Sequence, residues 1–401
     1  MGLILTNNKE ELLFDSITIS EVDSTVSLSN ISGELLLRIE LPFKISKIPP
    51  KLKDISKNLE EIKIFRNNYF NQLDVNEFFL KQEGQPQIRQ ALFFKLSIIS
   101  EEEAVKLIKQ DKFLQSAIFR SIIKLLQNKV SIPAKRKKQT RENLFSLFDF
   151  YDEDLIIGVF PYDWNPKMDA KQLTSFLFNA NKLGFYPLID LSDYKFTPTL
   201  NKIQETNYLS IKPSKSSKRK KIIFELLEDE FAQNGFFLQF IQNLVKRRSD
   251  PISRFHMLYQ NIELVSDIVL KIELNKRICA NQNINTFNGY KLKKLTNEIS
   301  LESYRLNKFF ESYSDCHVKN NYNIPFEILH FLELYTDSAD KKELNTFGRI
   351  LYEFRNQIVH NSQFVYSGNN EEIEDKVNQI GKLNNFIEYA IIDSIVNARF
   401  S

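Results

Sequence analysis

The sequence predicts an α+β N-terminal region, with a strand-rich start and a mixed middle, followed by an all-α C-terminal domain built as a helical bundle. Apolar residues alternate with polar ones over 35–41, as in a strand with one buried face. After residue 222 they instead recur every three or four positions, as on one face of a helix. Phe is frequent, at 34 residues, and Gly is scarce, at 10, which favours helices packed through aromatic side chains.

Length and composition indicate a soluble, multi-domain protein. A chain of 401 residues exceeds one ordinary core, so two or three domains are expected. The net charge of +3 does not by itself require a nucleic-acid partner. Cys279 and Cys316 form no disulfide framework, and neither a signal peptide nor an apolar run of membrane-spanning length occurs. We therefore expect a cytoplasmic protein with no membrane partner.

Residues 1–212 are predicted to form the α+β region, either as one body or as two subdomains, 1–130 and 142–212. A turn at Asn30–Gly33 separates two strand patterns and predicts a hairpin. From 51 to 130 the pattern is mostly helical, and 113–127 is strongly amphipathic.

Residues 142–212 show a strand–helix–strand order. The strands are expected at 155–160 and 186–190, and the helix between them at 169–183, ended by Gly184. No phosphate-binding glycine loop, either G-x-x-x-x-G-K or G-x-G-x-x-G, is present, so no nucleotide cofactor is expected. The region is assigned to sensing, to docking of a regulatory partner or to restraint of the C-terminal domain, and the sequence does not separate these roles.

Ser-rich, basic residues 213–221 are predicted to be a linker to the C-terminal domain, residues 222–401. Asp250-Pro251 is a helix start, with Asp as the cap and Pro in the first turn. The other predicted helices cover about 222–247, 300–315, 325–336, 341–361 and 371–399. The basic runs 135–141, 215–221 and 246–248 either bind RNA phosphates or are solvated linkers.

Histidines are few, which limits the chemistry that the chain can carry. The four are His256, His317, His330 and His360. Neither H-E-x-x-H nor C-x-x-C occurs. The Cys316-His317 pair is isolated from other possible metal ligands in the sequence. No metal site is expected.

The candidate catalytic residues are Arg355, Asn356 and His360, near the end of one helix. Arginine stays charged and binds phosphate through paired donors, and imidazole exchanges a proton near neutral pH. Together they suffice for metal-free RNA cleavage, with Asn356 orienting them and Glu263 as a supporting residue. The alternative is structural: Arg355 pairs with a carboxylate and His360 is a solvated helix-end residue.

The segment Arg355-Asn356-Gln357-Ile358-Val359-His360 resembles the R-x4–6-H signature of the HEPN superfamily, in which a polar residue commonly follows the arginine. The helix containing 254–263 resembles the first helix of such bundles, and the resemblance covers about 222–401. It implies a metal-independent endoribonuclease acting on RNA as a homodimer, of the kind found in prokaryotic toxins and abortive-infection effectors of anti-phage defence. HEPN toxins paired with nucleotidyltransferases usually have tyrosine two residues after the histidine, where this chain has Ser362.

The geometry of the helix also favours a dimer. Residues five apart on a helix diverge by about 140° around the axis and about 7.5 Å along it, so one helix gathers Arg355 and His360 poorly. Two alternatives stay open. The domain is a non-catalytic HEPN-like module for dimerisation or for binding nucleotide or RNA, or the chain is one subunit of a larger defence complex.

Overall fold

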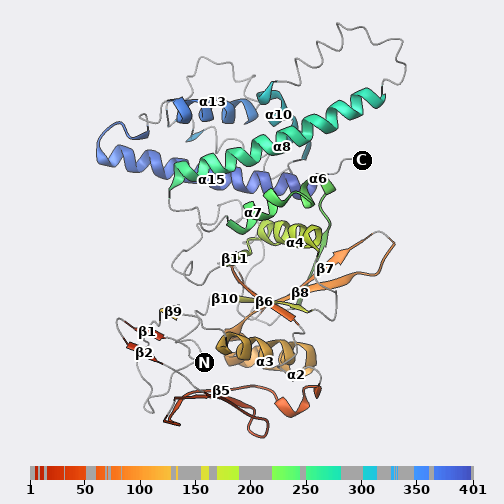
Figure 1. The fold of residues 1–401 in the computed structure, drawn as a ribbon, viewed down its shortest axis with the longest axis vertical. Coiled ribbons are helices and arrows are strands. Elements are labelled where there is room, and N and C mark those ends of the chain that lie inside the picture. Colours follow the sequence, from red (N-terminus) through yellow and green to blue (C-terminus); the bar gives the residue numbers. More distant parts are fainter. Residues whose placement is uncertain are drawn as a thin grey trace. The chain divides into compact units, whose positions relative to one another are not determined.

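The computed structural model describes residues 5–7, 10–12, 16–30, 32–50, 60–67, 70, 74–82, 84–127, 132–133, 155–161, 169–188, 219–243, 250–280, 301–313, 327, 328, 330, 332, 347–360 and 365–398. Two compact units account for the chain (Figure 1). The first comprises residues 1–169, 184–198 and 208–226, and the second comprises 170–183, 199–207 and 227–401.

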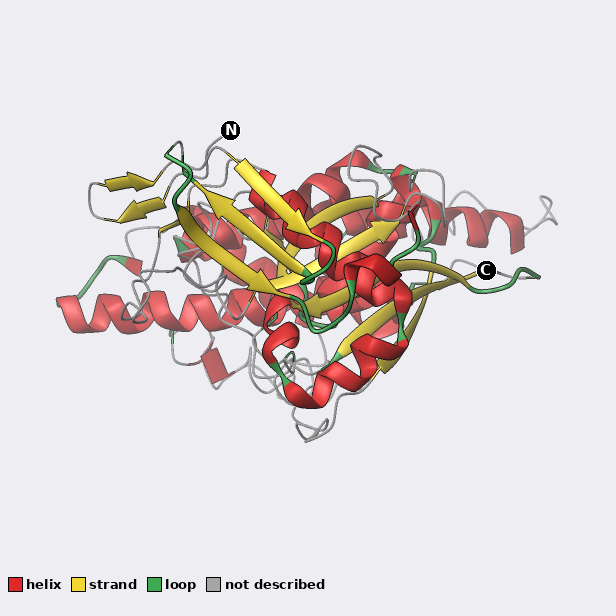
Figure 2. Cartoon of the chain, turned by 90° about the horizontal axis from the view of Figure 1, so that it is seen from below, coloured by secondary structure: helices red, strands yellow, loops and turns green. Residues whose placement is uncertain are grey.

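A six-stranded sheet forms the centre of the first unit (Figure 2, strands in yellow). Its strand order is β11-β6-β10-β8-β7-β12. The bounds are β6 (Glu60–Arg66), β7 (Val75–Lys81), β8 (Ile88–Lys95), β10 (Leu155–Pro161), β11 (Tyr186–Leu188) and β12 (Arg219–Glu225). Neighbouring strands are antiparallel except β12, which runs parallel to β7. The edge strand β12 therefore comes from a segment far from β7 in the sequence.

Aromatic side chains fill the core beside this sheet. The Phe93 ring lies 4.5 Å from that of Phe65, 4.8 Å from that of Phe78 and 5.1 Å from that of Phe185, between ring centroids. Gly158 on β10 makes room for them, because a Cβ atom there would lie 2.7 Å from the Phe65 ring and 2.8 Å from the Phe93 ring. The many phenylalanines thus serve a sheet as well as helices.

The prediction that 51–130 is mostly helical is wrong, because β6, β7 and β8 lie in this span. Its last part is helical as predicted, with α2 (Glu102–Gln110) and α3 (Lys112–Gln127). β10 pairs with both β6 and β8. Strands from 1–130 and from 142–212 therefore share one sheet and do not form separate subdomains.

Two smaller sheets complete the first unit, each of three strands. One contains β3 (Ser16–Ser20), β4 (Thr25–Ser29) and β5 (Leu35–Glu40), and the other contains β1 (Leu5–Asn7), β2 (Glu10–Leu12) and β9 (Ile132–Pro133). Short 3-10 helices cover Ile45–Lys47 and Leu96–Ser100. The β4–β5 hairpin confirms the prediction, and its turn has Gly33 at φ +77° with its N–H donating to the Asn30 carbonyl.

Every regular element in the described part of the second unit is a helix. These helices are α4 (Ala170–Lys182), α6 (Asp229–Ala232), α7 (Gly235–Asn243), α8 (Pro251–Ala280), α10 (Glu302–Tyr313), α13 (Phe347–His360) and α15 (Asn370–Asn397). Helix α8 packs against α10 and α15, α10 also packs against α13, and α4 packs against α6, α7 and α15. A strand-rich N-terminal region and a helical C-terminal part are thus confirmed.

Helix α4 belongs to the second unit although its flanking strands β10 and β11 belong to the first. Lys182 pairs with the fully buried Asp393 of α15 at 2.6 Å. The Ser175 hydroxyl accepts a hydrogen bond from the Leu227 N–H at 3.0 Å, just before α6. The strand–helix–strand order was predicted correctly, but its helix is held by C-terminal helices.

The predicted helix over 222–247 is wrong. Residues 219–225 are strand β12, and the helices begin only at Asp229. Of the predicted linker 213–221, residues 219–221 are therefore strand residues, and 213–218 lie outside the described part. Most of the predicted helix 325–336 also lies outside it. No helix among the described residues combines the length and apolar character needed to cross a membrane.

Candidate functional site

Helix α13 is anchored by an apolar stripe. Leu351, Phe354 and Ile358 are buried, and the Phe354 ring meets the Phe255 ring of α8 edge-on at 4.7 Å between centroids. The stripe begins at Leu344 in the sequence, which precedes the described part of the helix. Because the stripe packs against the core, the rotation of α13 about its axis is fixed. The directions in which the residues beside the stripe leave the helix are therefore fixed as well.

Gly348 brings the start of α13 close to α10. Its N–H donates to the Asn307 Oδ1 at 2.7 Å. A Cβ atom at position 348 would lie 2.5 Å from both the Asn307 backbone nitrogen and the Leu306 Cβ. Only glycine fits this approach, so the axial position of α13 against α10 depends on it.

Arg355 and Asn356 lie together on α13, as predicted. The Arg355 Nη1 donates to the Asn356 Oδ1 at 3.1 Å, and its Nη2 lies 3.7 Å from the Glu263 Oε1 of α8. The Cζ atom lies 5.7 Å from the centroid of the Tyr259 ring. The Arg355 side chain is 33% exposed, so this guanidinium is held on several sides and still reaches solvent.

His360 is the last residue of α13, five positions after Arg355. Its side chain is outside what the structure describes. The backbone therefore places this predicted residue at the C-terminal end of the helix.

Tyr259 and Glu302 were not identified from the sequence. Tyr259 of α8 is 3% exposed, and its hydroxyl donates to the Glu302 carboxylate in the first turn of α10. Burial, reinforced by the Glu302 charge, raises the pKa of Tyr259, so the phenol keeps its proton. Tyr259 appeared in the sequence only as one of several apolar positions on a helical stripe, which carries no signal for a polar contact.

Glu263 is the carboxylate closest to Arg355 among the described contacts. Burial, followed by repulsion from Glu302, raises the pKa of Glu263, and Arg355 partly offsets both effects. Asp267, one turn further along α8, also raises it and lies 3.6 Å from Arg305 of α10. Arg355 therefore lies partly exposed beside the acidic residues Glu263 and Glu302, which repel each other.

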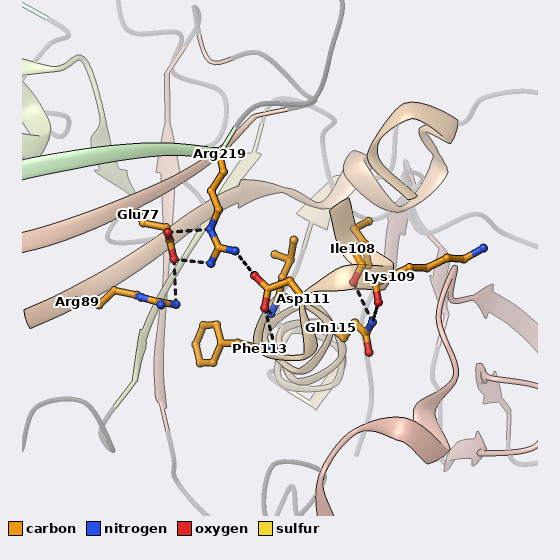
Figure 3. A network of polar contacts seen from close by, with 9 residues as sticks. Glu77, Arg89, Ile108, Lys109, Asp111, Phe113, Gln115 and Arg219 are labelled. Atoms are coloured by element: carbon orange, nitrogen blue, oxygen red, sulfur yellow. Dashed lines mark hydrogen bonds and ion pairs between the residues drawn. The ribbon is translucent and has the colours of Figure 1, made fainter. Parts of the chain in front are cut away.

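The basic run 215–221 has a structural role in its described part, 219–221 (Figure 3). Arg219 donates from Nε and Nη2 to the Glu77 carboxylate at 2.8 and 2.6 Å, and its Nη1 lies 2.6 Å from the Asp111 Oδ2. Arg89 approaches the same Glu77 carboxylate at 2.9 Å. The Glu77 hydrogen bonds are the main reason that the pKa of Arg219 is raised.

The next two residues of β12 are engaged in the same way. Lys220 pairs with Asp74, and the Lys221 Nζ lies 4.6 Å from the centroid of the Phe79 ring. These cations fasten an edge strand to β7. Residues 219–221 therefore belong to a sheet edge and not to a linker. The runs 135–141 and 246–248 are outside the described ranges.

Comparison with known proteins adds no constraint. No protein-family model, curated protein or solved structure matches this chain. Within the residues that the structure describes, no three or more His, Cys, Asp or Glu side chains are grouped so as to hold a metal ion.

Proposed function

We propose that this chain is a metal-independent endoribonuclease of the HEPN type, with an all-α C-terminal bundle that cleaves RNA as a homodimer. The observation that carries the proposal is the setting of Arg355. Its guanidinium donates to Asn356, lies 3.7 Å from Glu263 and 5.7 Å from the centroid of the Tyr259 ring, and remains one-third exposed, on the helix that ends at His360. A positioned, solvent-accessible guanidinium is suited to bind a phosphodiester.

The proposed reaction is an internal transfer. The ribose 2′-oxygen attacks the adjacent phosphorus and loses its proton to a base, while the bond from phosphorus to the 5′-oxygen breaks and that oxygen receives a proton. The products are a 2′,3′-cyclic phosphate and a 5′-hydroxyl. His360 serves as acid–base, Arg355 stabilises the charge on the phosphorane, and Asn356 orients Arg355.

Two copies of α13 facing each other would complete the site, since the spacing of 355 and 360 separates the two groups on one helix. In cells we propose the role of a cytoplasmic toxin or abortive-infection effector. The strand-rich N-terminal unit would then sense a trigger or bind a regulatory partner.

The test uses purified full-length protein, RNA and EDTA. We expect cleavage that survives EDTA, yields cyclic-phosphate ends and is lost in Arg355→Ala and His360→Ala. Arg305→Ala, which removes another arginine of the same helical unit, is the matched control and should keep activity. Cleavage that is abolished by EDTA but persists in His360→Ala contradicts the proposed mechanism, and a fully active monomer contradicts the dimer.

A non-catalytic role is the second candidate, and the Glu263 contact favours it, because an arginine paired with a carboxylate is common at structural interfaces. In that case the domain is a dimerisation or nucleotide- or RNA-binding module of a larger defence complex. Growth arrest on expression of the wild type, but not of Arg355→Ala or His360→Ala, supports the enzyme. Equal behaviour of all three, with co-purification of an unrelated chain, supports the module.

A further inference from the structure

We infer that Tyr259 and Glu302 form a positioning relay for Arg355, in which Glu302 fixes the Tyr259 ring through its hydroxyl and the ring supports the guanidinium. The inference rests on the proposed function, and it adds two positioning residues to that site. The relay joins three helices, because Glu302 lies on α10, Tyr259 on α8 and Arg355 on α13.

The first step of the relay is the bond from the Tyr259 hydroxyl to the Glu302 carboxylate. A phenol that is 3% exposed has almost no access to water, so its donor depends on a partner in the protein. Hydrogen bonds to an ionised carboxylate are stronger than those between neutral groups. Glu302 thereby restricts both the tilt and the position of the ring.

The second step is the contact between the ring and Arg355. A guanidinium over an aromatic face is attracted by the ring quadrupole, and it gains most where water is excluded. Asn356 and Glu263 contact the guanidinium through its N–H groups, whereas Tyr259 supports its face. These are different contacts, so Glu263 does not substitute for the ring.

The relay leaves donors available for substrate. A guanidinium has five N–H donors. The contacts with Asn356 and Glu263, at Nη1 and Nη2, engage at most one donor each among the described residues. At least three donors therefore remain for phosphate oxygens, and the face contact holds them in place without using any of them.

The relay predicts different outcomes for conservative substitutions. Tyr259→Phe keeps the ring and removes the bond to Glu302, so we expect kcat for RNA cleavage to fall about tenfold with KM nearly unchanged. Glu302→Ala removes the acceptor and should have the same effect. Glu302→Gln keeps an oxygen that accepts the phenol proton, so kcat should be restored to within about twofold. KM should be unchanged or lower, because a negative charge near the phosphate is lost.

The experiment measures kcat and KM together with a second signal that does not depend on cleavage, the NMR resonance of the Arg355 guanidinium, assigned by its loss in Arg355→Lys. We expect this resonance to shift in Tyr259→Phe and Glu302→Ala and to stay near its wild-type position in Glu302→Gln. Tyr366→Phe, at an exposed tyrosine of the same unit, is the control and should change neither readout.

The outcomes separate the two ideas. An unshifted resonance and wild-type kcat in Tyr259→Phe overturn the relay while the nuclease stands. A wild type without ribonuclease activity but with the expected shifts overturns the proposed function, and the relay then remains as the arrangement that holds Arg355. Loss of kcat in Glu302→Gln equal to that in Glu302→Ala also overturns the relay, because charge and not the hydrogen bond would then matter.

Discussion

Arg219 on the edge strand β12 donates two hydrogen bonds to Glu77 on β7, at 2.8 and 2.6 Å, although the two residues are 142 positions apart in the chain. The same guanidinium reaches Asp111, whose Oδ1 accepts the N–H groups of Phe113 and Leu114 at the start of α3. One side chain thus links the edge of the sheet to a helix of the same unit. A basic segment that resembles a linker in sequence is held as a strand by these contacts.

Arg219→Lys should loosen β12. Lysine cannot make the two-pronged contact with Glu77 and reach Asp111 together, so the free energy of unfolding should fall by about 1–3 kcal/mol. Amide exchange of β12 should also become faster, as measured by hydrogen–deuterium exchange. Arg38→Lys is the matched control, because Arg38 and Glu40 are 3.6 Å apart with side chains 46% and 77% exposed, and its effect should stay within about 0.5 kcal/mol. Equal effects of the two variants would contradict the structural role of Arg219.

The sequence predicted the elements that have a clear period or a recognisable start, and it missed β6, β7 and β8 within 51–130. The hairpin ending in β5 and the amphipathic α3 each show a clear period, and α8 has a recognisable start at Asp250-Pro251. In β8, consecutive residues Phe93 and Phe94 are both buried, so the alternation that marks a strand disappears. Strand β12 was missed for another reason, since Arg219 and Lys220 pair with Asp74, Glu77 and Asp111, which lie far away in sequence.

From the sequence, Arg355 and Asn356 on one helix and Glu263 on another were chosen for the candidate site, but Tyr259 and Glu302 were not. Arg355 and Asn356 were found because their spacing on α13 is visible in the sequence. Tyr259 and Glu302 come from α8 and α10, and no local pattern indicates which tyrosine of a helical stripe lies beneath an arginine. Tertiary packing decides that contact, and a single sequence does not report it.

Gly348→Ala should displace α13 from α10. The added Cβ atom would lie 2.5 Å from the Asn307 nitrogen and the Leu306 Cβ, so the helices must separate or unfold locally, at a cost of about 1–3 kcal/mol. RNA cleavage should fall as well, because Arg355 moves with the helix. Thermal unfolding and initial cleavage rates check this.

Gly381→Ala on α15 is the control for that variant. No heavy atom lies within 4 Å of the position of its Cβ atom, and alanine is the better helix former, so the protein should gain up to about 1 kcal/mol. A Gly348→Ala protein as stable and active as Gly381→Ala would contradict the close approach of α10 and α13.

Asp250 caps α8, and substitutions of it should reveal how much the cap and its negative charge each contribute to the free energy of unfolding. Its carboxylate accepts the Ser253 N–H at 2.8 Å and the Ser253 hydroxyl, and these bonds lower its pKa below the ordinary value of 3.8. Asp250→Ala should cost about 1 kcal/mol at pH 7, while Asp250→Asn keeps an acceptor and should cost less.

The pH dependence of this cap follows from the lowered pKa. The stabilisation by the charge is complete above pH 3.8, the unfolded value, and is lost as the pH falls through the lower folded value. The difference in unfolding free energy between wild type and Asp250→Asn should therefore be constant near neutrality and shrink in acid. A constant difference down to pH 2 would show that the charge of Asp250 contributes nothing.

Glu263 and a bound phosphate compete for Arg355, and this competition predicts how RNA binding depends on pH. The raised pKa of Glu263 means that it takes up a proton at higher pH than an ordinary glutamate. As the pH falls through that value, the carboxylate loses its charge, Arg355 is released and repulsion of the phosphate disappears. Binding of a 2′-O-methylated RNA, which cannot be cleaved, should therefore tighten as the pH falls from 7.5 toward 4.5, the ordinary glutamate value, more steeply in wild type than in Glu263→Gln. At pH 7.5 the variant should bind about 3- to 10-fold more tightly, in line with the loss of one nearby like charge.

Glu374→Gln, at an exposed acidic position of α15, is the control and should keep the wild-type slope, since Glu374 is not among the charges that shift the pKa of Glu263. Weaker binding by Glu263→Gln at every pH would contradict competition and show instead that Glu263 holds Arg355 in its binding position.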